Sequence, residues 1–242
     1  MAKSIHQMEL ESGGVLVTGA GSGIGLEIVR ALLSEHRCTV WALARNGDQR
    51  LAKESTSHPD RLRVLDYDLN DPDSIHSITE SIGSHRLIGL VHNAALLGKQ
   101  DFGTYTQEGL EQLFRINTVV PLLLTQALAS RLEGEPHGHV VHISSMGGFQ
   151  DSMKFPGLAA YSSSKAALAC LAQCLAEEFK GRGIHSNCLA IGAVDTAMLQ
   201  AAFPGYKAPV TPESMGQFIA WFTLNGHNLF NGKVLPVSAS TP

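Results

Sequence analysis

The chain has 242 residues, of which 44% are hydrophobic and 17% are charged. This composition allows a sizeable buried core and excludes intrinsic disorder, a collagen-like repeat and a small disulfide scaffold. Its 18 Lys and Arg against 22 Asp and Glu leave a formal net charge of -4, which gives no electrostatic reason to expect nucleic acid or an anionic membrane as a partner. We therefore expect one domain that binds a small molecule.

The sequence carries no obvious targeting signal. Its most apolar segment, residues 119–124, is short and contains Pro121, whereas a membrane-spanning helix requires roughly 18 to 20 apolar residues. Residues 1–13 are mostly polar and are expected to form a flexible extension rather than a secretory or transit peptide. The four cysteines lack CxxC spacing, so we expect buried, reduced thiols in a soluble cytoplasmic protein.

Apolar runs alternate with segments of helical spacing along the whole chain. In order, we expect a strand at 15–17, a helix at 24–33, a strand at 38–44, a helix from about 47, a strand at 63–67, a helix at 71–82, a strand at 87–92, a helix at 106–131, a strand at 140–143, a helix at 159–180, a strand at 184–191, an irregular stretch to about 211, a helix at 212–224 and a strand at 233–237. This alternation predicts an α/β fold of the doubly wound type, in which a parallel sheet lies between two helical layers in a single three-layer domain. Ligands of such sheets bind at the carboxyl ends of the strands.

A glycine-rich turn, residues 18–25, joins the first strand to the first helix. Backbone N–H groups and a helix N-terminus unobstructed by side chains are what a pyrophosphate requires. The flanking strand and helix favour nucleotide binding over a plain connection. The predicted contacts are Gly19, Ser22, Gly23, Ile24 and Gly25.

The end of the second strand bears on the choice of nucleotide. An acidic residue there would hold a ribose 2'-hydroxyl, but the chain has Arg45, whose guanidinium suits a 2'-phosphate. NADP(H) is therefore favoured, and NAD(H) is the alternative if Arg45 is only a solvated surface residue. Asp68 and Leu69, after the third strand, are placed to contact the adenine, although Asp68 could equally be a cap.

Tyr161 and Lys165 are four residues apart on a predicted helix, so their side chains share one face. A neighbouring ammonium lowers the pKa of a phenol, and a tyrosine tuned in this way can donate a proton to a carbonyl oxygen while a nicotinamide supplies hydride. Taken alone, this pair could be an ordinary helix-surface pair.

Two further polar positions support a catalytic interpretation. Ser144 and Ser145 end a strand, where a hydroxyl could orient a substrate carbonyl. Asn117 lies within an otherwise apolar helical pattern, which indicates either a kink that relays protons through water or an exposed position.

In the order and context of these motifs, the chain resembles the short-chain dehydrogenase/reductase family over nearly its whole length. The glycine turn, His92-Asn93-Ala94-Ala95 and the positions of Asn117, Ser145, Tyr161 and Lys165 carry the resemblance. It implies a Rossmann fold with those four residues as the catalytic set. It also implies that Lys165 contacts the nicotinamide ribose. Further cofactor contacts are expected from Asn93, Ala94, Gly192, Val194 and Thr196.

The sequence departs from the family pattern near the predicted substrate site. The stretch from Ser145 to Tyr161 is about three residues longer than usual, which leaves Ser144 as the alternative catalytic serine. Residues 192–211 are expected to form an apolar lid, which favours an apolar or mixed substrate. Phe155, Met198 and Tyr206 are the predicted substrate contacts.

The sequence-based hypothesis is a metal-independent, NADPH-dependent reductase of a carbonyl substrate, a ketone or a 3-oxoacyl compound, or the reverse dehydrogenase. The rival hypothesis is a nucleotide sensor of the same fold with little catalysis. Apolar residues on the two longest helices favour a homodimer or homotetramer. The histidines at 137, 139 and 142 are interpreted as parts of a loop and a strand edge, because successive strand residues face opposite sides.

Overall fold

The computed structural model describes residues 13–239 and contains a seven-stranded sheet. Every neighbouring pair of strands is parallel, and their order is β3-β2-β1-β4-β5-β6-β7. The strands are β1 (Gly14–Thr18), β2 (Thr39–Ala44), β3 (Leu62–Asp66), β4 (Leu87–His92), β5 (Gly138–Ser145), β6 (Ile184–Ile191) and β7 (Val234–Val237). The predicted doubly wound parallel sheet is confirmed, and all seven strands occur where they were expected.

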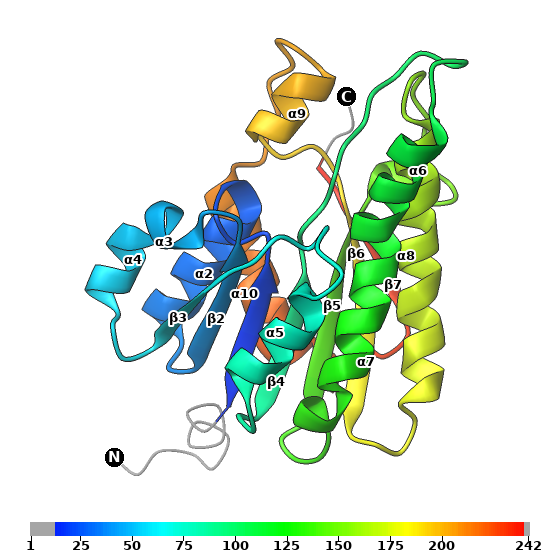
Figure 1. The fold of residues 1–242 in the computed structure, drawn as a ribbon. Coiled ribbons are helices and arrows are strands. Elements are labelled where there is room, and N and C mark those ends of the chain that lie inside the picture. The colour runs from blue at the N-terminus through cyan, green and yellow to red at the C-terminus, as the bar shows by residue number, and fades with distance from the viewer. Residues whose placement is uncertain (1–12, 240–242) are drawn as a thin grey trace.

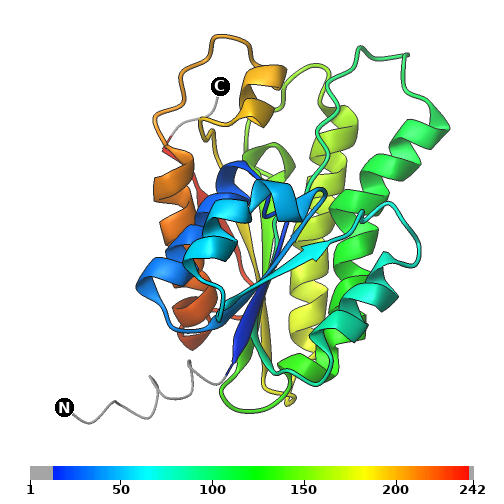
Figure 2. The same ribbon diagram turned by 60° about the vertical axis from the view of Figure 1, so that its left-hand side comes forward.

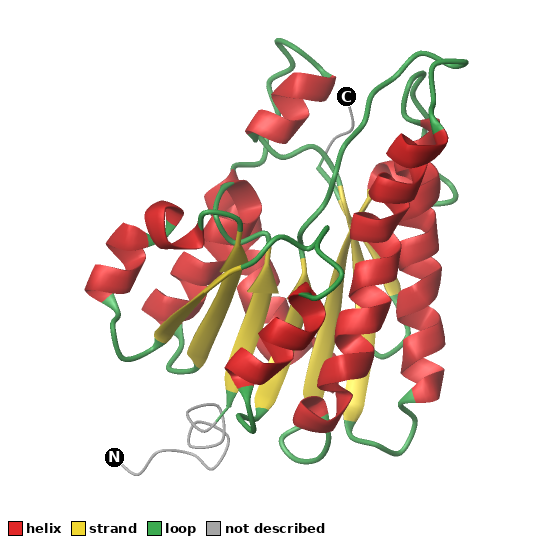
Figure 3. Cartoon of the chain, in the orientation of Figure 1, coloured by secondary structure: helices red, strands yellow, loops and turns green. Residues whose placement is uncertain are grey.

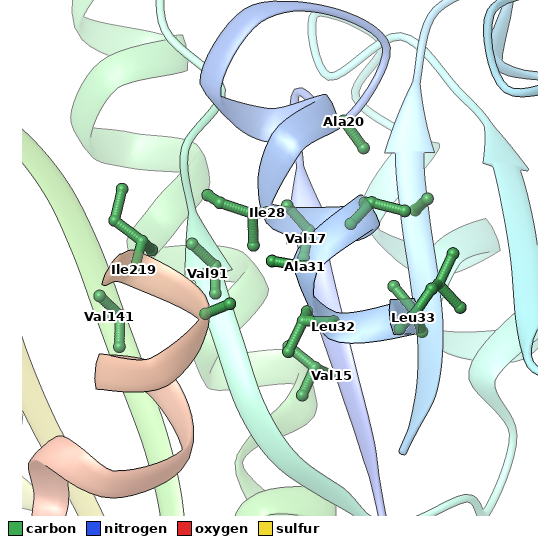
Figure 4. Packing of buried hydrophobic residues seen from close by; sticks show 14 of the residues in the cluster. Val15, Val17, Ala20, Ile28, Ala31, Leu32, Leu33, Val91, Val141 and Ile219 are labelled. Carbon is green, nitrogen blue, oxygen red and sulfur yellow. The ribbon is translucent and has the colours of Figure 1, made fainter. Parts of the chain in front are cut away.

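Helices cover both faces of this sheet (Figures 1 and 3). They are α2 (Gly23–Glu35), α3 (Gly47–Arg50), α4 (Ala52–Ser57), α5 (Ser74–Ile82), α6 (Gln107–Phe114), α7 (Val120–Leu132), α8 (Ala159–Glu178), α9 (Ala197–Ala202) and α10 (Pro212–Asn225), with 3-10 turns at Met146–Gly148 and Gly226–Asn228. Against one face, α2 and α10 pack on the valines of β1 (Figure 4). Against the other, α5, α7 and α8 bury leucines and isoleucines.

Three helical features differ from the expected pattern. The segment from about residue 47 forms two short helices, α3 and α4, separated at Leu51. The stretch expected to be irregular contains α9, which lies beyond the carboxyl ends of the strands (Figures 1 and 2). The helix expected at 106–131 is interrupted between α6 and α7 by a π-helical turn, Arg115–Val119.

The continuous helical run Gln107–Leu132 has 26 residues and, by length and composition, could cross a membrane. Here half of its most apolar window is buried within the protein. Leu124, Leu128 and Leu132 pack in the core against the sheet. The run therefore serves as a core helix of this domain.

The cysteines are only partly as expected. Cys38 and Cys188 are buried, but Cys170 and Cys174 are exposed on α8, so the expectation that all four are buried is wrong. Both lie on the side of α8 opposite Leu168, Ala169 and Ala172, which face the interior. Of the extension expected at residues 1–13, only Gly13 lies among the described residues, where its carbonyl accepts a hydrogen bond from Thr39.

Candidate active site

The glycine turn has a shape that side chains would block. Gly19 and Gly23 have φ angles of 68° and 53°, in the left-handed region that favours glycine. A Cβ on Gly25 would lie 2.2 Å from the carbonyl oxygen of Gly19. Ser22 occupies the N-cap of α2 without a side-chain capping bond, and Ile24 lies in the first helical turn. The open N-terminus of a 13-residue helix and the bare backbone fit the pyrophosphate of a dinucleotide.

A clamp between Thr18 and Asn93 holds this turn against β4. The hydroxyl of Thr18 accepts hydrogen bonds of 3.0 Å from the N–H groups of both Asn93 and Ala94. The Asn93 amide donates to the carbonyls of Thr18, at 3.0 Å, and Gly19, at 3.3 Å. Asn93 therefore positions the turn, and Thr18 is a positioning residue that the sequence analysis missed.

The side chains predicted to contact the nucleotide's ribose lie together at the ends of β2 and β3. Arg45 is 67% exposed, and its guanidinium lies 3.9 Å from the Asp68 carboxylate. Arg50 packs over the turn, since a Cβ on Gly21 would lie 2.7 Å from its Cδ. Asp68 also accepts hydrogen bonds from the backbone and side chain of Asn70 in the loop before α5, whose N-cap is Asp73, so Asp68 is not a helix cap. Leu69 beside it is buried.

Tyr161 and Lys165 occupy the first two turns of α8 and face the same region. The ammonium of Lys165 lies 5.9 Å from the centre of the Tyr161 ring and donates a hydrogen bond of 2.8 Å to the carbonyl of Ile143. Lys165 is 2% exposed, and this burial lowers its pKa to about 8. Burial raises the pKa of Tyr161, and a hydrogen bond from Ser145 partly opposes that rise. The ammonium donates to Ile143, and the effect of Lys165 on the pKa of Tyr161 stays a prediction.

The two candidate serines point to opposite sides of β5. The Ser144 hydroxyl is buried and donates to the carbonyl of Lys165 at 2.8 Å, which fixes the catalytic helix to the sheet. The Ser145 hydroxyl accepts from the N–H of Gly147 at 3.1 Å and lies in the same cleft lining as Tyr161, whose pKa it lowers. The structure thus brings Ser145, rather than Ser144, to the phenol.

Asn117 lies within the π-helical turn and is completely buried. Its amide oxygen accepts from the N–H of Leu96 at 2.8 Å, and its NH₂ group donates to the Leu96 carbonyl and the Ser164 hydroxyl, each at 2.9 Å. It therefore joins the segment after β4 to α8. Its position is neither exposed nor on the cleft surface, so in this structure it acts as a positioning residue.

A cleft opens in front of Tyr161 at the carboxyl edge of the sheet. Its polar lining comes from Ser145, Tyr161 and Thr196. Its apolar lining includes Leu97, Met146, Met153, Phe155, Met198 and Phe203. Ile24, Gly192 and Val194 also line it, whereas the predicted contact Tyr206 does not. Leu97, Met146 and Phe203 lay outside the sequence-based set of substrate contacts.

The segment expected to form a lid is held by backbone pairing near its two ends and by an aromatic contact beyond α9. Val194 forms a parallel bridge with Val210, and the N–H of Asp195 donates to the carbonyl of Val210 at 2.9 Å. Thr196 caps α9 by accepting from the N–H of Leu199 at 3.2 Å. Beyond α9, the ring of Phe203 meets that of Phe155 edge-on, with centroids 5.3 Å apart.

The buried histidines do not form part of this cleft. His92 and His142 stack on neighbouring strands with ring centroids 5.0 Å apart. His139 is held between the carbonyl of Thr223 and the side chain of Asn187. Both His139 and His142 are thus core residues rather than loop or edge residues. Within residues 13–239, no group of three or more His, Cys, Asp and Glu side chains is arranged to hold a metal ion.

Comparison with known proteins places the chain in a family. The family model described as short chain dehydrogenase matches residues 14–207. The chain is 34% identical over 193 residues to carbonyl reductase [NADPH] 2 of Sus scrofa, covering 79% of this chain and 76% of that one. It is 31% identical over 212 residues to 1-deoxy-11-beta-hydroxypentalenate dehydrogenase of Streptomyces exfoliatus, covering 84% and 73%.

A solved structure from Beutenbergia cavernae, described as a candidate NAD(P)-dependent gluconate 5-dehydrogenase with NADP bound at low occupancy, is similar throughout. It is 26% identical and superposes with a TM-score of 0.84 over 96% of this chain and 97% of that one. The sequence match, the parallel sheet and the clustering of Ser145, Tyr161 and Lys165 agree, and the chain belongs to the short-chain dehydrogenase family of oxidoreductases.

Proposed function

We propose that this protein reduces the carbonyl group of a ketone or 3-oxoacyl compound with NADPH, or catalyses the reverse oxidation. The observation that carries the proposal is the grouping of Ser145 and Tyr161 in the lining of one apolar cleft, next to the buried ammonium of Lys165. The similarity to a carbonyl reductase of Sus scrofa supports the same reaction class.

The nicotinamide ring of the cofactor, when bound, supplies or accepts the hydride. Residues of the glycine turn would bind the pyrophosphate, and Arg45 would select a 2'-phosphate over a free hydroxyl. Lys165 would hold the nicotinamide ribose, and Gly192, Val194 and Thr196 would border the ring. The exposed guanidinium of Arg45 at the end of β2, paired only at 3.9 Å with Asp68, supports NADP(H) over NAD(H).

Ser145 orients the substrate carbonyl, and Tyr161 donates a proton to its oxygen. The phenolate left behind is stabilised by the positive charge of Lys165, and it regains its proton from solvent. Because water would compete for these groups, the apolar walls of the cleft strengthen each of these interactions by excluding it.

The direct test is oxidation of NADPH by a panel of ketones, followed by its absorbance. We expect Tyr161→Phe to lower kcat by about 100-fold or more while cofactor affinity is retained. Tyr105→Phe is the matched control, because the Tyr105 hydroxyl bonds only to the carbonyls of Gln100 and Gly157. Cofactor binding without turnover of any ketone would instead favour the nucleotide sensor.

We also infer a homodimer or homotetramer in the cytoplasm, with no nucleic acid or membrane partner. Val119, Leu122 and Leu123 are 42%, 40% and 37% exposed on the face of the core helix turned from the sheet, which supports a contact there between copies of the chain. Leu122→Glu should shift the mass measured by light scattering towards the monomer. An unchanged mass would show that α7 does not form the contact between copies of the chain.

A further inference from the structure

The walls of the cleft carry no charge. Among the described residues that line it, none is an acid, a base or a histidine. The groups that can hydrogen-bond through their side chains are Ser145, Tyr161 and Thr196, and under the proposed function the first two bind the reacting carbonyl. A substrate can therefore place one carbonyl oxygen among polar partners, while the remainder of the molecule contacts hydrocarbon and thioether groups.

Two lysines next to wall residues, Lys99 and Lys154, are already engaged by the protein. The ammonium of Lys99 donates to the carbonyl of Ala202 at 2.8 Å and lies 4.8 Å from the centre of the Phe203 ring. The ammonium of Lys154 donates to the carbonyls of Phe149, at 2.5 Å, and Ser152, at 3.0 Å. Both charges hold loop backbone, so a substrate carboxylate or phosphate would have to displace these bonds to gain either as a partner.

The apolar walls are built from adaptable and aromatic side chains. Three methionines reach the cleft from three segments: Met146 after β5, Met153 in the following loop and Met198 on α9. Methionine is unbranched and polarizable, so it fills irregular space and contacts aromatic rings favourably. Phe155 and Phe203 meet edge-on and add flat surfaces.

Two of these methionines are exposed at the cleft. Met153 is 67% exposed and Met198 is 41% exposed. Burying such surface against an apolar ligand contributes about 25 cal/mol for each Å² removed from water. By contrast, a carboxylate or a run of hydroxyl groups would lose its hydration at the walls without gaining hydrogen-bond partners.

We propose that the substrate is an uncharged ketone whose carbon skeleton is aromatic or alicyclic, and that carboxylated, phosphorylated and polyhydroxylated carbonyl compounds are excluded. This inference rests on the proposed carbonyl reductase function. The ketone carbon gains hydride from NADPH, the oxygen gains the Tyr161 proton, and the products are a secondary alcohol and NADP⁺. Tyr161 is then reprotonated from solvent, so one ketone, one NADPH and one proton are consumed in each turnover.

A matched pair of substrates tests the inference. Acetophenone and 4-acetylbenzoate present the same aryl methyl ketone, and the second adds one carboxylate at the far end of the ring. We expect kcat/KM to be about 100-fold lower or more for the carboxylate, since its charge would face the apolar wall unpaired. Equal values, or faster reduction of 4-acetylbenzoate, of a 2-keto sugar acid or of acetoacetyl coenzyme A, would overturn the inference while leaving the proposed function intact. Oxidation of NADPH by none of these compounds would count against the proposed function itself.

A charge placed on the wall separates the effect of polarity from that of shape. Met198→Lys should lower the preference for acetophenone over 4-acetylbenzoate by about 10-fold or more, because the new ammonium pairs with the carboxylate. Met198→Leu, which keeps the wall apolar, should keep the preference. NADPH affinity, measured by its fluorescence, reports that each variant is folded. A preference that Met198→Lys leaves unchanged would show that this wall does not contact the substrate, and the inference would fail.

Discussion

Asn117 donates a hydrogen bond of 2.9 Å to the hydroxyl of Ser164, which itself donates at 2.8 Å to the backbone carbonyl of Tyr161. The same amide accepts from and donates to the backbone of Leu96. The path from the segment after β4 to the first turn of α8 is thus made of direct hydrogen bonds between buried and partly buried groups.

Removing this amide should destabilise the fold as well as the site. In Asn117→Ala the N–H and carbonyl of Leu96 both lose their partner, and each unsatisfied buried group costs about 1 to 3 kcal/mol. We expect the free energy of unfolding, measured in urea, to fall by about 3 kcal/mol. Asn228→Ala, at an exposed position, is the control and should change it by less than about 0.5 kcal/mol. A fully stable Asn117→Ala protein would contradict the positioning role assigned to this residue.

The lowered pKa of Lys165, about 8, predicts an alkaline limit to activity. Loss of the ammonium removes the charge that stabilises the phenolate, so kcat/KM for reduction should fall as pH rises above about 8.

The stability of the fold should change in the opposite direction over the same pH range. Since the ordinary pKa of 10.5 applies to the unfolded chain, that chain binds more protons between pH 8 and 10.5, and the free energy of unfolding rises with pH there by up to about 1.4 kcal/mol per unit. Lys165→Met should abolish the rise, and its persistence in that variant would assign it to other groups.

The buried histidines predict sensitivity to acid. Burial lowers the pKa of both His92 and His139 to about 3, from the ordinary value of 6.5. Below pH 6.5 the unfolded chain therefore binds protons that the folded chain does not, and stability falls as the pH falls, by up to about 1.4 kcal/mol per unit for each histidine. His92→Gln should reduce the slope of unfolding free energy against pH by one histidine. His76→Gln, at an exposed position, should leave it unchanged.

Cofactor selection is tested at Arg45. Arg45→Asp removes the donor for a 2'-phosphate and adds an acceptor for a ribose hydroxyl, so the ratio of kcat/KM with NADPH to that with NADH should fall by about 100-fold. Lys233→Asp makes the same change of charge at an exposed position before β7, and it should keep the ratio. If both variants shift the ratio alike, the effect is one of overall charge and Arg45 is not the selecting residue.

The features that the sequence predicted best are those set by local chemistry. Buried strands such as β4 consist mostly of apolar residues, and the shared face of Tyr161 and Lys165 follows from the geometry of one helix. Features that depend on the path of a loop were not predictable: α9 has six residues within a Pro- and Gly-rich stretch, and Phe203 and Leu97 enter the cleft from segments without periodicity. The direction of the Lys165 ammonium towards Ile143 is likewise a tertiary property, because its partner is 22 residues away in the chain.

A hydrogen bond from the Lys99 ammonium to the Ala202 carbonyl joins the segment after β4 to the end of α9, beside the cleft. The segment that carries Lys99 is itself held by the hydrogen bond between Leu96 and Asn117, so a movement of α9 away from it would break the Lys99 bond. Weakening this hydrogen bond should speed the release of a bulky alcohol product more than the chemical step that forms it. With the bond intact, slow release of the alcohol should make the first turnover appear as a burst followed by a slower steady rate, and a weakened bond should reduce that burst.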